Sequence, residues 1–364
     1  MTPAAPRPER ARRDARRVAV VGAGIMGRVL TAHLLARGCT VTLFDRDPRD
    51  RGGAAAWTAA GMLAPWAELE AAEPQVHSLG RRSLELWPAL IASLGAAVDF
   101  HQRGSLVVAH PRDHRELGHF RQRLARQGVA DRDAKTVDRD ALTTLEPALA
   151  DTFGEALWLP GEAWLDTGKV MAALGAHLLA RGVDWRAQTP VTALAPGRVS
   201  TARGDHAFDQ VFDCRGLGAR ADIPALRGVR GEVLWLEAPE VALSRPVRLL
   251  HPRYRLYLVP RTDNRYVLGA TQIESDDNGP VTVRSALELL SAAWSLHPGF
   301  AEARILHAEA NCRPALDDNL PLIDSRPGLT RINGLFRHGY LLAPALAELA
   351  CRAQVATILE SRKP

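Results

Sequence analysis

Cysteine is scarce in this sequence of 364 residues, with only four copies. They lie far apart, form no C-x-x-C pair, and so indicate neither a disulfide framework nor a zinc site. Long apolar runs are also missing, because none approaches the ~18 residues that a membrane-spanning helix needs. We therefore expect a cytoplasmic protein with no membrane span and no metal site.

Excess charge of one sign is absent outside the N-terminus. The chain carries a formal charge of +5, but residues 1–17 hold six arginines and two acidic residues, which leaves +1 for the rest. A net charge so close to zero outside the N-terminus is not typical of a nucleic-acid-binding protein. We expect residues 1–17 to form a disordered basic tail rather than a targeting signal, because the apolar segment that follows is punctuated by glycine.

The N-terminal part has the pattern of a dinucleotide-binding unit. A short run of small and β-branched residues predicts a strand buried on both faces, and the helix after it should end at Gly38. Between them, Gly22, Gly24 and Gly27 form a G-x-G-x-x-G turn that would place a pyrophosphate at the helix N-terminus. Asp45 ends the second strand, where it can accept hydrogen bonds from ribose hydroxyls. This unit predicts a dinucleotide without distinguishing FAD from NAD.

A run of small residues at 51–65, RGGAAAWTAAGMLAP, favours FAD. The isoalloxazine ring must lie against backbone, and side chains beyond Cβ would hold it away. Ala59, Ala60, Gly61 and Met62 can run extended beside the pyrophosphate and flavin and offer backbone N–H groups. A flexible linker is the alternative, but the large apolar side chains in and beside this run are unusual for linkers.

The order of predicted elements indicates a mixed α/β (α+β) fold. Segments 229–238, 254–261 and 265–272 alternate in the manner of antiparallel strands, whereas both ends of the chain read as α/β units. We predict a Rossmann-like FAD-binding domain with an inserted antiparallel-sheet substrate domain. The predicted FAD-binding domain comprises residues 18–90, 155–220 and 305–364, and the substrate-binding domain residues 91–154 and 221–304.

A second helix N-terminus is predicted in the segment 333–359. A glycine-containing loop leads into a helix that should begin near Pro344, since proline is favoured in a first turn. A helix N-terminus directed at the flavin would stabilise the negative charge of its reduced form.

Several motifs together resemble the D-amino-acid-oxidase-like flavoproteins, and among them most closely the glycine oxidases of the thiazole branch of thiamine synthesis. They are GAGIMG…FDRD, AAGMLAP, LYLVPR…RYVLGATQ, CRPALDDNLPLI and GLFRHGYLLAP, in the same order and spacing. The resemblance covers nearly the whole chain after residue 17. It implies that Arg313 binds the substrate carboxylate in a bidentate fork, with Tyr257 beside it and Arg337 above the substrate and flavin.

The motifs and the resemblance together give a set of candidate cofactor-binding residues. These are Gly22, Gly24, Ile25, Met26, Gly27, Asp45, Arg46, Ala59, Ala60, Gly61, Met62, Val191, Gly216, His338, Gly339, Tyr340 and Leu341.

Some positions depart from the glycine oxidase pattern. The motif here is NCRP rather than GLRP, Leu335 replaces a usual histidine, and His338 replaces a usual asparagine. Gln272 follows GAT, where at least some relatives carry an apolar residue, so we count it among the candidate catalytic residues. These departures alter the amine side of the pocket. Cys312 could carry a covalent flavin, but an inert buried thiol is the better interpretation, and we expect non-covalent FAD.

The resulting hypothesis is an FAD-dependent oxidase of glycine or a similar small amino acid or amine. Hydride transfer from Cα to flavin N5 would give an imino acid, and dioxygen or another acceptor would reoxidise the cofactor, yielding hydrogen peroxide with dioxygen. One alternative is a dehydrogenase or oxidase of another amine, such as a D-amino acid or sarcosine. A second is a flavoprotein directed to tRNA through its basic tail, although we expect no nucleic-acid partner. A homo-oligomer is compatible with the sequence.

Overall fold

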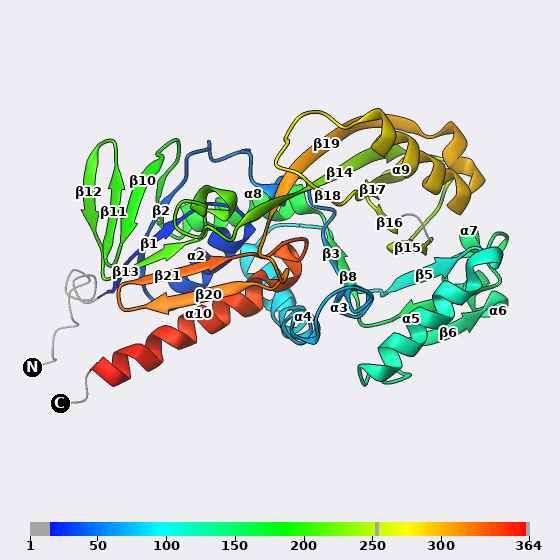
Figure 1. The fold of residues 1–364 in the computed structure, drawn as a ribbon, viewed down its shortest axis with the longest axis horizontal. Coiled ribbons are helices and arrows are strands. Elements are labelled where there is room, and N and C mark those ends of the chain that lie inside the picture. Colours follow the sequence, from blue (N-terminus) through cyan, green and yellow to red (C-terminus); the bar gives the residue numbers. More distant parts are fainter. Residues whose placement is uncertain (1–14, 252–254, 362–364) are drawn as a thin grey trace, which may run out of the picture.

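The computed structural model describes residues 15–251 and 255–361. Residues 1–14 of the predicted basic tail lie outside this part, and Arg17 already begins the first strand. The fold is mixed α/β, as the sequence predicted. Two large sheets dominate it, and each carries helices (Figure 1). In the described part of the chain, no helix is long and apolar enough to cross a membrane.

The first large sheet has the Rossmann-like arrangement. Its order is β20-β21-β13-β1-β2-β9, and all neighbours are parallel except the pair β20 and β21. The strands are β1 (Arg17–Val21), β2 (Thr40–Phe44), β9 (Asp184–Arg186), β13 (Gln210–Asp213), β20 (Leu322–Arg326) and β21 (Leu329–Asn333).

Both faces of this sheet are covered, which explains the uninterrupted apolar run in its first strand. Val18 and Val20 pack on the helical side, whereas Ala19 and Val21 pack on the other side against a small antiparallel sheet. That sheet consists of β10 (Val191–Ala195), β11 (Arg198–Thr201) and β12 (Gly204–Ala207). The helical side is formed by α2 (Ile25–Ala36), α4 (Pro74–Leu94), α8 (Thr167–Ala180) and α10 (Gly339–Ser361).

The last helix, α10, begins five residues earlier than the sequence predicted. It starts at Gly339, so Pro344 lies inside its second turn. Proline has no N–H to donate to the carbonyl four residues earlier. Here the indole N–H of Trp87 donates to that carbonyl, of Tyr340, at 3.0 Å, and the Ser83 hydroxyl accepts from the amide of Ala345. Side chains of α4 thus compensate for the interruption.

The second large sheet is mainly antiparallel. Its order is β18-β14-β17-β16-β15-β5-β7-β6, and β19 pairs with β14. The strands are β5 (Ser105–Ala109), β6 (Lys135–Asp138), β7 (Glu155–Leu159), β14 (Arg227–Glu237), β15 (Val247–Leu250), β16 (Arg255–Pro260), β17 (Arg265–Gly269), β18 (Ile273–Glu274) and β19 (Arg304–Ala315).

Further helices, a small sheet and short turns complete the fold. One face of the second sheet packs against α9 (Val283–Leu296), α6 (Arg139–Leu145) and α7 (Pro147–Ala150), and α5 (His114–Arg126) packs near β5. A second small sheet consists of β3 (Met62–Leu63), β4 (Phe100–His101) and β8 (Ala163–Leu165), and α3 (Pro65–Glu68) follows β3. The 3₁₀ turns of the described residues are η1 (Ala55–Trp57), η2 (Pro111–Asp113), η3 (Gly216–Ala219) and η4 (Pro298–Glu302).

Two strands fall on the other side of the predicted domain boundaries. The sequence assigned 155–220 and 305–364 to the cofactor domain, yet β7 and β19 pair within the second sheet. In Figure 1 the long strands β14 and β19 run together from the Rossmann-like region into the second sheet. We keep the division into a cofactor domain and a substrate domain as a proposal, with these two strands moved to the latter.

Candidate functional site

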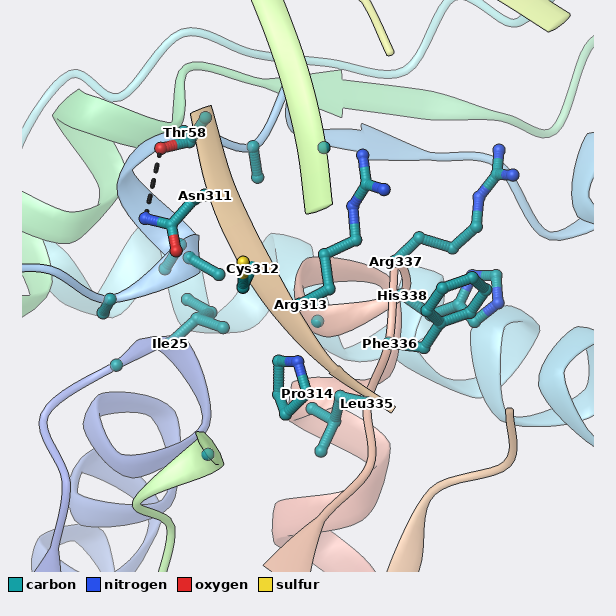
Figure 2. A pocket seen from close by; sticks show the side chains of 18 of the residues that line it. Ile25, Thr58, Asn311, Cys312, Arg313, Pro314, Leu335, Phe336, Arg337 and His338 are labelled. Carbon is teal, nitrogen blue, oxygen red and sulfur yellow. Dashed lines mark hydrogen bonds between the residues drawn. The ribbon is translucent and has the colours of Figure 1, made fainter. Parts of the chain in front are cut away.

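A large cavity runs from the glycine turn to the second sheet. Its volume is about 1410 Å³, which exceeds the ~300–1,000 Å³ of most small-molecule sites. One end is lined by the N-terminal turn and the end of β2, and the other by β14, β16 and β19. Figure 2 shows the C-terminal part of β19, where the side chains of Arg313 and Arg337 extend in the same direction.

Glycine occurs at each of the three positions of the turn for a different physical reason. Gly22 has a φ of +101°, and a Cβ on it would lie 2.5 Å from the carbonyl oxygen of Cys214. A Cβ on Gly27 would lie 1.8 Å from the carbonyl oxygen of Gly22, so this residue allows the helix to approach the turn. A Cβ on Gly24 would meet only Ala54, at 3.7 Å. Protein packing therefore does not require glycine at 24, whereas a ligand close to the backbone would.

Asp45 has a second task beside the one predicted for it. Its carboxylate accepts hydrogen bonds from the backbone amides of Ala23 and Asp47, the latter at 2.7 Å. These contacts fix the turn relative to the end of β2. Burial raises the pKa of Asp45, and the carboxylate still borders the cavity.

The small-residue segment is anchored through its carbonyl groups. Tyr340 donates to the carbonyl of Ala56 at 2.9 Å, Thr167 to that of Ala59 at 3.0 Å, and Arg261 to that of Ala60 at 2.7 Å. Among the described residues, the amides of Ala59 and Ala60 have no hydrogen-bond acceptor. The segment is therefore held from one side, and its N–H groups are available to a ligand.

Small residues are also needed for packing at the end of this segment. Gly61 has a φ of +76°, and a Cβ there would lie 2.2 Å from the carbonyl oxygen of Leu165. The amide of Leu165 in turn donates to the carbonyl of Gly61 at 3.0 Å. Gly61 thus fixes the segment against β8 at the edge of the cavity.

The N-terminus of α10 opens on the same cavity. The amide of Leu342 donates to the carbonyl of His338, which makes His338 the residue that caps the helix. His338, Gly339 and Tyr340 line the cavity, and Gly339 lies beside Ile25 at the start of α2. Two helix N-termini therefore converge here, and both favour negative charge on a ligand.

Arg313 projects from β19 without a countercharge. Its Nη1 donates to the carbonyl of Thr271 at 3.1 Å, and no carboxylate of the described residues lies within ion-pair distance of it. Burial lowers the pKa of Arg313. A Cβ on Gly231 of β14 would lie 2.1 Å from Nη2, so the guanidinium group occupies the space that this glycine leaves. Such a partly buried and unpaired arginine is suited to binding a ligand carboxylate.

Tyr257, like Arg313, lies against a glycine of a neighbouring strand. A Cβ on Gly269 would lie 3.1 Å from the edge of the Tyr257 ring, and both residues belong to the face of the sheet that packs toward Ala60 and Met62. Tyr257 lines the cavity together with Arg313. The antiparallel strands thus bring a phenol and a guanidinium group to one wall.

A buried ionic cluster forms the adjacent wall. Glu68 accepts from Nη2 of Arg248 at 2.8 Å and pairs with Nε and Nη2 of Arg337, each at 3.2 Å. Burial alone would raise the pKa of Glu68, but Arg337, Arg248 and His338 outweigh it and lower the pKa to about 2. Burial lowers the pKa of His338 to about 4, so its ring is neutral near pH 7.

Two further candidates, Gln272 and Cys312, differ in their hydrogen-bond partners. Gln272 is exposed, lines the cavity, and makes no side-chain hydrogen bond to any described residue. Cys312 points its thiol at the carbonyls of Ser275 and Asp277, each at 3.4 Å, and burial raises the pKa of the thiol. The Cys312 thiol is therefore a poor nucleophile at neutral pH.

The structure brings nearly all the predicted site residues together. Apart from Gly27, whose place is behind the turn, every candidate borders the cavity. They are Gly22, Gly24, Ile25, Met26, Asp45, Arg46, Ala59, Ala60, Gly61, Met62, Val191, Gly216, Tyr257, Gln272, Arg313, Arg337, His338, Gly339, Tyr340 and Leu341. Their individual roles toward a ligand remain predictions.

Sequence reasoning missed several residues that shape this site. Gly231 carried a signal, because a glycine inside a strand pattern often marks a close approach. Glu68 carried none, because its burial and its pairing with arginines depend on the folded chain. Arg248 and Arg261 also gave none, because the same region contains arginines, such as Arg265 and Arg304, that the structure leaves exposed.

The residues present fit FAD. The cavity begins at a dinucleotide-binding turn, and α2 has no acidic residue in its first turn and no side chain bonded to its N-terminal amides. The open space at Gly24 and the available amides of Ala59 and Ala60 match a pyrophosphate and a flat ring beside backbone. A dinucleotide with a bulky ring explains both the length of the cavity and the small residues along it.

Known proteins resemble the chain over nearly its whole length. The family model described as DAO, FAD dependent oxidoreductase, matches residues 17–353. A Rhizobium etli protein named as the thiamine biosynthesis oxidoreductase ThiO is 45% identical over 331 residues, which cover 91% of this chain and 94% of that protein. The glycine oxidase of Geobacillus kaustophilus is 27% identical over 345 residues, covering 90% and 89% respectively.

Solved structures agree with this similarity. The crystal structure of glycine oxidase from Geobacillus kaustophilus has a TM-score of 0.80 at 25% identity and covers 96% of each chain. That of iminodiacetate oxidase from Chelativorans sp. BNC1 has a TM-score of 0.79 at 26% identity and covers 93% of this chain and 95% of that chain.

Proposed function

The chain belongs to the DAO family of FAD-dependent oxidoreductases, and we propose that it oxidises the amine of glycine or of a similarly small amino acid. The product would be an imino acid, and dioxygen would be reduced to hydrogen peroxide. The similarity to a thiamine biosynthesis oxidoreductase and to a glycine oxidase supports this proposal. The same similarity supports a role in supplying the thiazole part of thiamine.

The observation that carries the proposal is the unpaired guanidinium group of Arg313. It projects into the cavity beside Tyr257, and no described carboxylate neutralises it. A substrate carboxylate would accept two parallel hydrogen bonds from its fork and a further one from the Tyr257 hydroxyl. These contacts fix the substrate at one end and leave its Cα and amine to face the rest of the cavity.

The cofactor would be held by residues at the opposite end of the cavity. The amides at the start of α2 would bind the pyrophosphate, Asp45 the ribose, and the segment from Ala59 to Met62 the flavin edge. FAD, when bound, supplies the hydride acceptor and passes the electrons on. The N-terminus of α10 would stabilise negative charge at that place.

The chain's own contribution to the reaction is positioning. Arg313 and Tyr257 orient the carboxylate, and small residues allow close approach to the ring. His338 stays neutral near pH 7 because burial lowers its pKa to about 4, so it adds no positive charge beside a substrate amine. No side-chain base is required when the amine arrives neutral, since orientation supplies a large share of the rate.

A peroxide-coupled assay tests the proposal. The purified holoenzyme is supplied with glycine, sarcosine, D-alanine and D-serine in air, and hydrogen peroxide is measured. We expect peroxide from at least one of them in a ratio of one to each amine consumed. Amine consumption only with an added quinone would instead support a dehydrogenase, and no consumption of any of the four would contradict the proposal.

A further inference from the structure

Arg313 and Arg337 both line the cavity, and their electrostatic surroundings differ. Arg313 has no carboxylate partner among the described residues, whereas Arg337 is paired through both Nε and Nη2 with the two oxygens of Glu68, at 3.2 Å each. In Figure 2 both side chains extend in the same direction from the region where β19 meets the α10 loop. The positive charge of Arg337 is therefore already balanced by the protein.

Arg248, which also belongs to this ionic cluster, is paired with carboxylates as well. Arg248 is buried and pairs with Glu68 at 2.8 Å and with Glu70 at 3.1 Å. It also donates to the carbonyl of Ala67 at 2.7 Å. Among the described residues, Glu68 and Glu70 thus pair with Arg337 and Arg248, whereas Arg313 has no carboxylate partner.

We infer that Glu68 is a specificity-determining residue that restricts the enzyme to substrates with a single carboxylate. A second carboxylate on the substrate would approach Arg337, and there it would meet the negative charge of Glu68 instead of a free cation. Like charges placed together disfavour the wrong ligand, and such repulsion is an effective means of selection. This inference deepens the proposed function and depends on its assignment of Arg313 to carboxylate binding.

One structural neighbour is named an iminodiacetate oxidase, and iminodiacetate carries two carboxylates. In this chain, the fork of Arg337 that could bind a second carboxylate is occupied by Glu68. The expected substrates are therefore amines such as glycine or N-alkylglycines, and dicarboxylic amines are excluded.

Equilibrium binding to the oxidised holoenzyme tests the inference without relying on catalysis. Methoxyacetate and oxydiacetate differ by one carboxylate, and neither has an amine that could be oxidised. Their affinities are measured by calorimetry for the wild type and for Glu68→Gln, which keeps the size of the side chain and one acceptor oxygen but removes its charge. We expect the wild type to bind oxydiacetate no more tightly than methoxyacetate, and Glu68→Gln to improve oxydiacetate binding by about tenfold or more.

Two control variants separate a specific effect from a general one. Glu70→Gln removes the same charge from the Arg248 side of the cluster and leaves the pair of Arg337 and Glu68 intact, so the ratio of the two affinities should stay as in the wild type. The double variant Glu68→Gln/Arg337→Met removes the released cation, so the gain for oxydiacetate should disappear.

The two control variants can each contradict the role of Glu68. An equal gain in Glu70→Gln, or a gain that persists in the double variant, would overturn the inference. If Glu68→Gln did not retain its cofactor, the wild type alone would still be informative, because tenfold tighter binding of oxydiacetate than of methoxyacetate would also overturn it. Absence of amine oxidation with normal methoxyacetate binding would count against the proposed function only. Binding of neither acid would remove the Arg313 site on which the inference rests.

Discussion

Gly231 lies directly against the guanidinium group of Arg313. A Cβ at residue 231 would be 2.1 Å from Nη2 and 2.3 Å from Cζ of that arginine. The two residues belong to the paired strands β14 and β19, where Val229 lies opposite Arg313 and Gly231 opposite Asn311. The glycine thus provides the space in which the proposed carboxylate-binding group sits.

Gly231→Ala should therefore weaken substrate binding without unfolding the protein. The added methyl group meets the end of a flexible side chain, so the guanidinium group of Arg313 can move away. It then no longer occupies the position proposed for carboxylate binding. We expect the KM for an amino-acid substrate to rise by about tenfold or more, with FAD content unchanged. Gly118→Ala serves as a control, because a Cβ there meets no atom within 4 Å. Unchanged kinetics in Gly231→Ala would show that Arg313 does not need this position.

Asp45 should matter for cofactor retention in two ways. Asp45→Ala removes both the proposed ribose acceptor and the acceptor for the amides of Ala23 and Asp47. Loss of hydrogen bonds to a charged group costs roughly 1.5–3 kcal/mol each, so FAD affinity should fall by at least tenfold. Asp45→Asn keeps one acceptor oxygen and should lose less. The measurement is the flavin that remains after dialysis, and full retention in Asp45→Ala would contradict the assignment.

Gln272 tests the amine side of the pocket. Its side chain has no hydrogen-bond partner among the described residues and borders the cavity, so its amide is available to a substrate. We expect Gln272→Met to shift the ratio of kcat/KM values toward glycine and away from D-serine. The readout is the ranking of glycine, sarcosine, D-alanine and D-serine in both forms. An unchanged ranking would rule out a role in specificity.

Glu162 should make stability fall as pH rises. It is fully buried, accepts from the amide of Ala67 at 2.7 Å and from the hydroxyl of Ser105, and burial raises its pKa to about 7 from 4.5. Because the folded state holds the proton more tightly, the contribution is complete below pH 4.5 and is lost as pH rises through 7. The loss amounts to up to about 3 kcal/mol.

The variant Glu162→Gln cannot titrate and should escape this loss. Its free energy of unfolding relative to the wild type should therefore increase between pH 5 and pH 8. Glu155→Gln, at an exposed position of β7, reports the general effect of removing one negative charge. A difference between Glu162→Gln and the wild type that is the same at both pH values would show that Glu162 does not hold a proton in the folded state.

The sequence was informative where one local rule decides the structure. The strand, glycine turn and helix around Gly22 follow from steric rules that act within a few residues, and β1 and α2 lie where they were predicted. The start of α10 was misplaced because the preference of proline for a first turn is local. The compensation of Pro344 by Trp87 depends on another helix that is distant in the sequence.

The ionic wall of the site could not be predicted from the sequence for the same reason. Glu68 comes from α3, Arg248 from β15, and Arg337 from the loop before α10, and only the folded chain brings them together. The resemblance to flavoproteins identified Arg313 and Arg337 alike. It did not reveal that one of them is already paired.

We propose that a small amino acid, held by Arg313, reduces the enzyme's flavin. Anaerobic mixing of the holoenzyme with glycine, sarcosine, D-alanine or D-serine measures this directly through the visible absorbance of the flavin. We expect bleaching by at least one of them, with Arg313→Ala needing roughly 30-fold or more substrate for half-maximal bleaching, as expected for loss of ~2–5 kcal/mol. Bleaching by dithionite but by none of the four amines, or equal bleaching in Arg313→Ala, would contradict it.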